Sequence, residues 1–197
     1  VAILIRSIAA AGGLPLCLTK QNKVLRELYR AATQEQMRFW GEVERHQMEG
    51  VQAYVGIRTA EQTLRLDELE PEEAIATLVR FTWTYYLQHP EFLTLVNSEN
   101  LHRARHLKNS EAVRAVSGKL VQMVTSILDR GVVAGVFRPG IDPVQLNITI
   151  AAIGYYYLTN RFTGSIVFGR DFMAPEHLDA RLAFNLETIL RLVKKNP

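Results

Sequence analysis

Aromatic side chains and a few amides give this 197-residue chain the chemistry of a small-molecule pocket. Pockets for organic ligands have mostly apolar walls and a few polar groups that converge on the ligand. Asn100 and Asn160 are favoured among the amides, because a buried amide needs a hydrogen-bond partner. For each aromatic residue taken alone, packing in a protein core is the alternative. We predict a ligand site formed by Phe81, Trp83, Tyr85, Phe92, Asn97, Asn100, Tyr155, Tyr156 and Asn160.

Motifs of catalysis are missing from the sequence, and we predict that the protein is not an enzyme. It contains no phosphate-binding glycine loop, no G-x-S-x-G elbow and no H-E-x-x-H motif. His102 and His106 are four residues apart, a spacing that is typical of a two-histidine metal site on a helix. Only Glu99 is near enough in sequence to complete such a site. We therefore predict a solvated basic face made with Arg103 and Arg105, with no metal and no cofactor.

The excess positive charge lies at the start of the chain. Residues 1–30 hold five basic residues and one acidic residue, whereas the other 167 hold 18 basic and 19 acidic residues. This asymmetry indicates that a polyanion faces one end of a nearly neutral body. The single cysteine, Cys17, excludes an internal disulfide and suits a reducing compartment. No signal peptide or membrane span is visible, so the cytoplasm is the expected location.

Helical periodicity dominates the rest of the chain, and we predict an all-α fold. Apolar residues recur at steps of three and four over residues 69–89, 110–135 and 175–195, and a shorter helix is expected over residues 92–106. Ser110 is the expected N-cap of the second of these helices. Residues 34–65 are polar and helical in composition, but their order is irregular.

The stretch over residues 144–158 is the central element of this prediction. It contains no charged residue, and apolar side chains fall on every face of a helix drawn through it. A helix that is apolar all round is normally buried on all sides. At 15 residues it is shorter than the ~20 needed to cross a bilayer. We expect a helix that begins at Asp142 and Pro143 and lies between its own domain and a second surface.

The first residues outline a helix-turn-helix, with a short helix over residues 3–11, a glycine turn, a second element and a long helix from Lys20 to about Glu49. IRSIAAAGGLP followed by TKQNKVLRELY resembles the DNA-binding domain of the TetR family of transcriptional regulators. The matching positions are Ile5, Ile8, Ala9, Gly13, Leu14, Thr19, Lys20 and Tyr29. HPEFLTLVNSENLHRARHL, GVFRPGIDPVQL and YYYLTNRFTGSIVFGRD are similar to the C-terminal ligand-binding and dimerisation domain of the branch that includes regulators of pyrimidine catabolism.

The resemblance implies a DNA-binding domain over residues 1–33 and a ligand-binding and dimerisation body over residues 34–197. It implies a repressor that binds double-stranded operator DNA and is released by a small-molecule effector. Lys20 would contact a phosphate at a helix N-terminus. The residues expected at DNA are Arg6, Ser7, Pro15, Leu16, Cys17, Thr19 and Lys20.

The resemblance also implies a homodimer in which the central and last helices of each subunit form a four-helix bundle. The residues expected at that interface are Ile150, Ile153, Tyr157, Leu182, Leu186 and Ile189.

The N-terminal part departs from the family pattern in two ways. The L-Y-x-H-F block is absent, and only five residues separate Gly13 from Thr19, where the family has about twice as many. We hypothesise that the natural protein has further residues in this N-terminal part that are missing from the present sequence. A real deletion would favour the alternative, an all-α small-molecule-binding or scaffold dimer that does not engage DNA. A helical enzyme is a third and more distant alternative.

Overall fold

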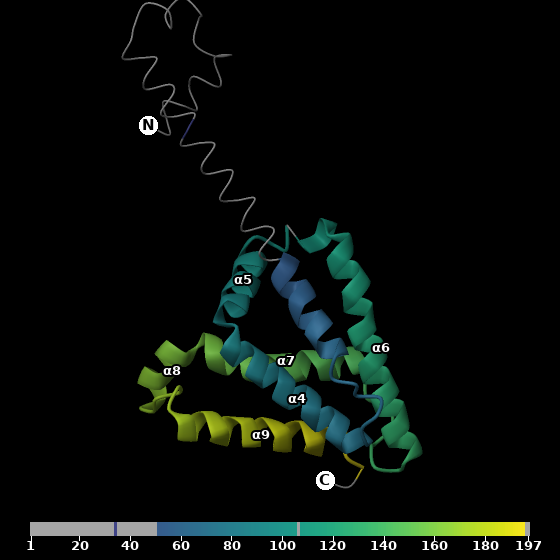
Figure 1. Cartoon of the computed structure of the whole chain (residues 1–197). Helices are drawn as coiled ribbons and strands as arrows, with labels where there is room; N and C mark the ends of the chain where they lie inside the picture. Colours follow the sequence, from purple (N-terminus) through teal and green to yellow (C-terminus); the bar gives the residue numbers. More distant parts are fainter. Residues whose placement is uncertain (1–33, 35–50, 106, 196–197) are drawn as a thin grey trace, which may run out of the picture. The chain divides into compact units, whose positions relative to one another are not determined.

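The structure is a computed structural model that describes Gln34, residues 51–105 and residues 107–195. A helical segment over residues 51–62 leads into α4 (Pro71–Gln88), α5 (Pro90–Leu101), the short 3₁₀ helix η1 (Leu107–Asn109) and α6 (Glu111–Val133). Then follow α7 (Pro143–Thr159), α8 (Arg161–Phe168) and α9 (Pro175–Val193) (Figure 1). Within these described ranges there is no strand, only an isolated antiparallel bridge between Phe137 and Lys194. The all-α prediction is confirmed.

Helix α4 is the central element of the described body. It packs against α5, α6, α7 and α9, and it crosses between α7 and α9 in Figure 1. Pro71 begins the helix with Glu72 and Glu73 in its first turn, where the helix dipole favours acidic side chains. One face of α4 enters the larger core, which comprises Leu66, Ala74, Ile75, Leu78, Val79, Leu120, Val124, Ile127, Leu128, Phe137, Leu146, Ile150, Ile189 and Val193.

The two predicted N-caps are confirmed. The side chain of Ser110 accepts a hydrogen bond from the backbone N–H of Val113 at 3.3 Å. Asp142 accepts from the N–H groups of Val144 at 2.7 Å and Gln145 at 3.2 Å. Each cap satisfies backbone donors that have no partner within the helix itself, and each fixes where its helix begins.

Helix α5 ends at Leu101, earlier than the predicted limit near residue 106. Arg103 and Ala104 adopt left-handed backbone conformations with φ of 57° and 53°, which an α-helix does not allow. The exposed side chains of His102, Arg103 and Arg105 have no apolar surface to bury. The prediction from helical composition therefore placed the end of this helix too late in the sequence.

Two contacts of α6 fix the neighbouring segments. Arg130 donates hydrogen bonds to the carbonyl groups of Leu66, Asp67 and Leu69, at 2.8, 3.1 and 2.7 Å. It thereby holds the turn between the 51–62 helix and α4 against α6. One turn from its end, α6 packs Gly131 beneath the buried ring of Phe137, at a position where a Cβ would lie 1.9 Å from the Cδ2 atom of that ring.

Candidate ligand site and subunit interface

A second core is rich in aromatic residues and combines side chains of the 51–62 helix, α4, α5 and α7 with Phe172 of the loop before α9. Tyr86 of α4 stacks on Phe92 of α5, with 5.7 Å between ring centroids, and contacts Tyr155 of α7 edge to face at 6.5 Å. The buried members of this second core are Ile57, Trp83, Tyr86, Phe92, Leu93, Tyr157, Leu158 and Phe172. We call this set, with the partly buried rings packed on it, the aromatic cluster.

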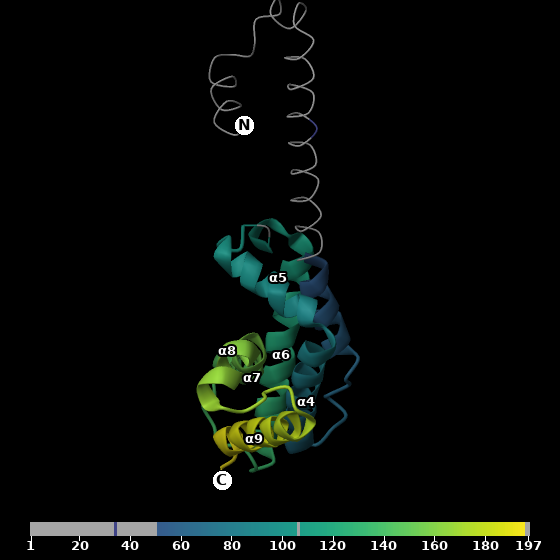
Figure 2. The same ribbon diagram turned by 90° about the vertical axis from the view of Figure 1, so that its left-hand side faces the viewer.

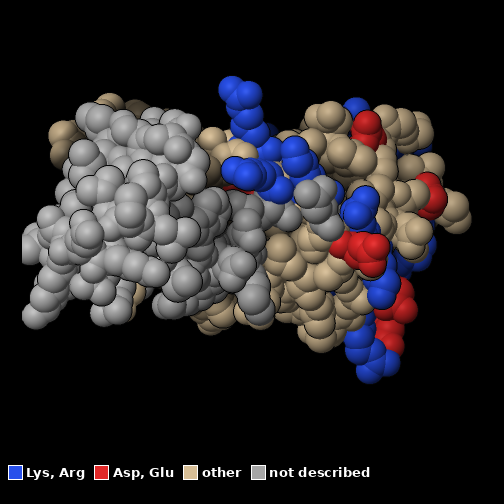
Figure 3. Space-filling view, turned by 90° about the horizontal axis from the view of Figure 1, so that it is seen from above, with Lys and Arg blue, Asp and Glu red and all other residues tan. Residues whose placement is uncertain are grey.

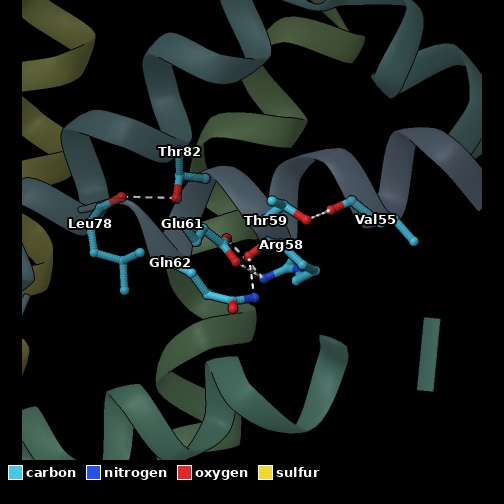
Figure 4. Close-up of polar contacts among 7 residues, drawn as sticks. All are labelled: Val55, Arg58, Thr59, Glu61, Gln62, Leu78 and Thr82. Carbon is cyan, nitrogen blue, oxygen red and sulfur yellow. Dashed lines mark hydrogen bonds and ion pairs between the residues drawn. The ribbon is translucent and has the colours of Figure 1, made fainter. Parts of the chain in front are cut away.

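A buried ion pair lies at the edge of the aromatic cluster, on the 51–62 helix. Arg58 donates from its Nη1 to both carboxylate oxygens of Glu61, at 2.9 and 2.8 Å (Figure 4). Glu61 is 3% exposed. Burial raises the pKa of the Glu61 carboxyl to about 7, although Arg58 opposes that change by favouring the charged form. Glu61 therefore changes charge near neutral pH.

The charges of this pair act on the tyrosines of the cluster. Burial raises the pKa of Tyr86 well above its usual range, with Arg58 lowering it and Glu61 raising it. Burial likewise raises the pKa of Tyr54, whose ring centroid lies 5.6 Å from that of Phe92. Nearby on α4, Thr82 donates to the Leu78 carbonyl at 2.9 Å, so its hydroxyl already has a partner (Figure 4).

The cluster gathers five of the nine residues predicted to bind a ligand. Trp83 and Phe92 are buried in it, and Phe81, Tyr85 and Tyr155 are partly buried against it. The hydroxyl of Tyr155 donates to the side-chain oxygen of Asn97, which joins α7 to α5.

The other residues predicted to bind a ligand, Asn100, Tyr156 and Asn160, are not members of the aromatic cluster. Asn100 is exposed, and its amide donates to the Val96 carbonyl of its own helix at 2.9 Å. The expectation of a buried amide is therefore wrong at Asn100. Asn160 is half-buried and donates to the Tyr156 carbonyl at 2.9 Å, while the Tyr156 side chain itself is 64% exposed.

Sequence reasoning missed Arg58 and Glu61, because the stretch around them is polar and irregular. The one signal that could have found them is their spacing of three residues, which places opposite charges on one helix face. A separate groove of about 350 Å³ lies between the end of the 51–62 helix and α6. Gln62, Lys119 and Arg130 line it beside Leu66, Met123 and Ile127, and none of the residues predicted to bind a ligand lies in it.

An apolar surface extends over α7, α8 and α9. Large apolar side chains that are well exposed there are Val144, Ile148, Tyr156, Phe162, Ile166, Val167, Phe168, Phe184 and Leu192. Figure 2 shows that α8 and α9 are both drawn on the near side of the body. Because α7 contacts both α8 and α9, this number of exposed apolar side chains on the three helices is typical of a protein–protein interface. Helix α7 is therefore not covered on every side within one subunit.

The residues predicted for the dimer interface lie on the inner sides of α7 and α9. Ile150, Tyr157 and Ile189 are buried within the subunit, whereas Ile153, Leu182 and Leu186 are half-buried. Arg181 of α9 donates to the Ile153 carbonyl at 3.0 Å and so ties α9 to α7. The hydroxyl of Tyr157 donates a hydrogen bond to the Phe172 carbonyl at 3.0 Å, so this side chain already has a partner within its own subunit.

The residues predicted to contact DNA, from Arg6 to Lys20, lie outside the described residues, as do the helices expected over residues 3–11 and 20–49. No group of three potential metal ligands occurs in the described part of the chain. His102 is exposed, and His106 is not described. Among the described helices, none has both the length and the apolar character that a membrane span requires.

Comparison with known proteins bears on both the body and its function. Residues 71–189 match the family described as tetracyclin repressor-like, C-terminal domain. The chain is also similar to the HTH-type transcriptional repressor NicS of Pseudomonas putida. The two are 36% identical over 142 residues, which is 72% of this chain and 67% of the relative.

Proposed function

Because the chain belongs to the TetR family of transcriptional regulators, we propose that it is a DNA-binding repressor that leaves its operator when a small molecule binds to its body. The observation that carries the ligand half of this proposal is the aromatic cluster with the Arg58–Glu61 pair at its edge. The similarity to a protein named as a transcriptional repressor supports the DNA half. Such a protein acts where the chromosome lies, in keeping with the predicted cytoplasmic location.

The proposed ligand site lies between the 51–62 helix, α4, α5 and α7. Aromatic rings supply flat apolar walls, and a buried charged pair supplies the polar groups that give orientation and specificity. Arg58 and Glu61 belong to the segment that continues the chain from residues 1–50. A ligand that changed the position of this pair would therefore act directly on the part of the body nearest in sequence to the DNA-binding residues.

We further propose that two subunits associate through the apolar surface of α7, α8 and α9. This proposal keeps the predicted central and last helices, adds α8, and places the contact on exposed side chains such as Ile148, Ile166 and Phe184. Two heads of such a dimer bind successive major grooves when their spacing is about one helical turn of DNA, ~34–36 Å, or a multiple of it. A ligand can release the protein from DNA only if it binds more tightly to a dimer whose head spacing does not fit the operator than to one whose spacing fits. The change in DNA affinity cannot exceed this difference in ligand affinity.

The test is fluorescence anisotropy of labelled DNA from upstream of the gene, titrated with the full-length protein across a salt series. A repressor is expected to bind one segment with a Kd of about 10⁻⁸–10⁻¹¹ M and with a steep dependence on salt. A panel of small metabolites is then screened for release of the DNA, with the tryptophan fluorescence of a Trp40→Phe variant, which reports Trp83 alone, as a second signal. Affinity equal to that for random DNA at every upstream segment would refute the DNA-binding function.

The ligand site is tested with Arg58→Gln, and Arg80→Gln serves as the matched control. Both changes remove one arginine charge, but Arg80 forms an exposed pair with Glu73 on α4. If the ligand binds in the aromatic cluster, Arg58→Gln weakens ligand-induced release and Arg80→Gln does not. Equal effects of the two variants would place the ligand elsewhere.

The second candidate is a ligand-binding or scaffold dimer that no longer engages DNA. The short segment between Gly13 and Thr19 favours it, because a recognition helix needs more residues than this segment offers. The same titration separates the two functions. The second candidate predicts ligand binding, seen as a change in the tryptophan fluorescence of the Trp40→Phe variant, without preferential binding to any DNA.

A further inference from the structure

The turn between α5 and α6 carries a concentration of positive charge that the function proposed above does not use. Arg103, Arg105, Lys108 and Arg114 are all exposed within twelve consecutive residues. The acids of the same segment are Glu99, which is buried, and Glu111, which is exposed. Excess basic charge on one small surface is the electrostatic feature that attracts a polyanion.

These four basic side chains are not neutralised by the body. Among the residues that the structure describes, none of them pairs with an acidic side chain, although Glu111 lies within a few residues. By contrast, Arg80 pairs with Glu73 at 3.0 Å and Arg191 with Glu187 at 2.9 Å. Figure 3 looks onto this end of the body and shows several Lys and Arg side chains, in blue, on the described surface.

The backbone holds this turn in a defined form. Arg103 and Ala104 are consecutive non-glycine residues in the left-handed region, which costs free energy and is uncommon. The turn is closed by hydrogen bonds from the N–H groups of Ala104 to the Glu99 carbonyl at 2.7 Å and of Lys108 to the Ala104 carbonyl at 3.1 Å. The backbone on either side of residue 106 is therefore held by hydrogen bonds at Ala104 and Lys108.

The turn also lies beside the start of the 51–62 helix. Tyr54, near the start of this helix, contacts Phe92 of α5, the helix that precedes the turn. Figures 1 and 2 both show the start of this helix beside the turn that joins α5 to α6.

We infer that this basic turn of the ligand-binding body, with Arg103, Arg105 and Lys108 in the turn and Arg114 in the first turn of α6, binds the phosphate backbone of DNA that flanks the operator. This inference rests on the proposed DNA-binding function and adds a second, sequence-independent contact to it. Arginine and lysine side chains hold phosphates without reading bases, so they add affinity and salt dependence and no sequence preference.

The experiment compares full-length wild type with a triple variant, Arg103→Gln, Arg105→Gln and Lys108→Gln. Binding is measured by anisotropy between 50 and 200 mM salt on two duplexes, the minimal operator and the same operator extended by one helical turn on each side. Each lost phosphate contact should lower the slope of log K against log salt by about 0.9, which is about a 3.5-fold effect over this range. The loss is expected on the extended duplex and not on the minimal one.

The control is a second triple variant, Arg80→Gln, Arg170→Gln and Arg191→Gln, which removes the same charge from other exposed positions. Circular dichroism and size-exclusion chromatography establish that both variants fold and associate like wild type. Equal slopes for wild type and the first variant on both duplexes would overturn the inference while leaving the repressor function intact. So would equal losses in both variants, or binding of the turn to anionic phosphatidylserine vesicles but not to DNA. A wild type that binds no upstream DNA would overturn the inference and the proposed function together.

Discussion

Replacing Glu61 with glutamine should change how the stability of the protein depends on pH. Burial raises the pKa of Glu61 from its ordinary value of 4.5 to about 7 in the folded chain. Between these two values the folded protein keeps a proton that the unfolded chain has released. The free energy of unfolding therefore falls as the pH rises through this window and stays low above it. One pKa unit corresponds to about 1.4 kcal/mol, so the loss is on the order of 3 kcal/mol by pH 8.

The measurement is urea denaturation of wild type and of Glu61→Gln at pH 5, 6, 7 and 8. A single protein concentration is used throughout, because the stability of an oligomer depends on concentration. Glutamine cannot ionise but still offers Arg58 an acceptor. We therefore expect the variant to gain about 3 kcal/mol relative to wild type between pH 5 and pH 8, while the titrations of all other groups cancel in the difference.

Glu73→Gln is the matched control, because Glu73 is an exposed glutamate that also pairs with an arginine. Its difference from wild type should stay nearly constant with pH, since exposed pairs contribute only about 0–1 kcal/mol. A constant difference for Glu61→Gln as well would refute the reasoning. It would mean that the carboxyl group is solvated and that the Arg58–Glu61 pair does not lie in a buried site.

Three further outcomes are expected. Ile166 is 84% exposed on α8, so Ile166→Glu should leave the helical content unchanged and reduce the mass in size-exclusion chromatography with light scattering from dimer to monomer; an unchanged dimer would exclude α8 from the interface. Gly131→Ala should lower the free energy of unfolding by about 1–3 kcal/mol because its Cβ meets the ring of Phe137, whereas Gly118→Ala, with nothing within 4 Å, should stabilise α6 by up to about 1 kcal/mol in urea denaturation. Asp142→Ala should cost about 1 kcal/mol by the same assay because α7 loses its N-cap, and Asp142→Asn should keep most of that stability.

Local signals in the sequence were enough to predict most helices of the body. A cap such as Ser110 or Asp142 acts within a few residues, so sequence spacing contains the information needed to place it. The end of α5 could not be predicted in this way. It depends on a turn in which Arg103 and Ala104 leave the helical region, and no glycine or proline marks that change.

The candidate site was predicted in part, and the reason lies in the kind of residue. Aromatic residues such as Trp83 and Phe92 are conspicuous because a large ring needs a packed environment wherever the chain puts it. Arg58 and Glu61 belong to a residue class that is normally exposed, so only the tertiary structure shows that Glu61 is buried and Arg58 partly buried. The same limit applies to α7, because its composition indicates an apolar helix but not which side chains its own subunit covers.

The hydrogen bonds of Arg130 have a mechanical consequence. Because they hold the turn after the 51–62 helix against α6, that helix has a fixed end near residue 66 and a far end at residue 51. The segment is 12 residues long, or about 18 Å at 1.5 Å per residue, so each degree of tilt about the fixed end moves residue 51 by about 0.3 Å. Glu61 lies close to the fixed end of the helix, and Tyr54 lies close to its far end at residue 51. The same tilt of the helix therefore displaces Tyr54 more than Glu61. A ligand that contacts the aromatic cluster near Tyr54 needs a smaller force to tilt the helix than one that contacts only Glu61.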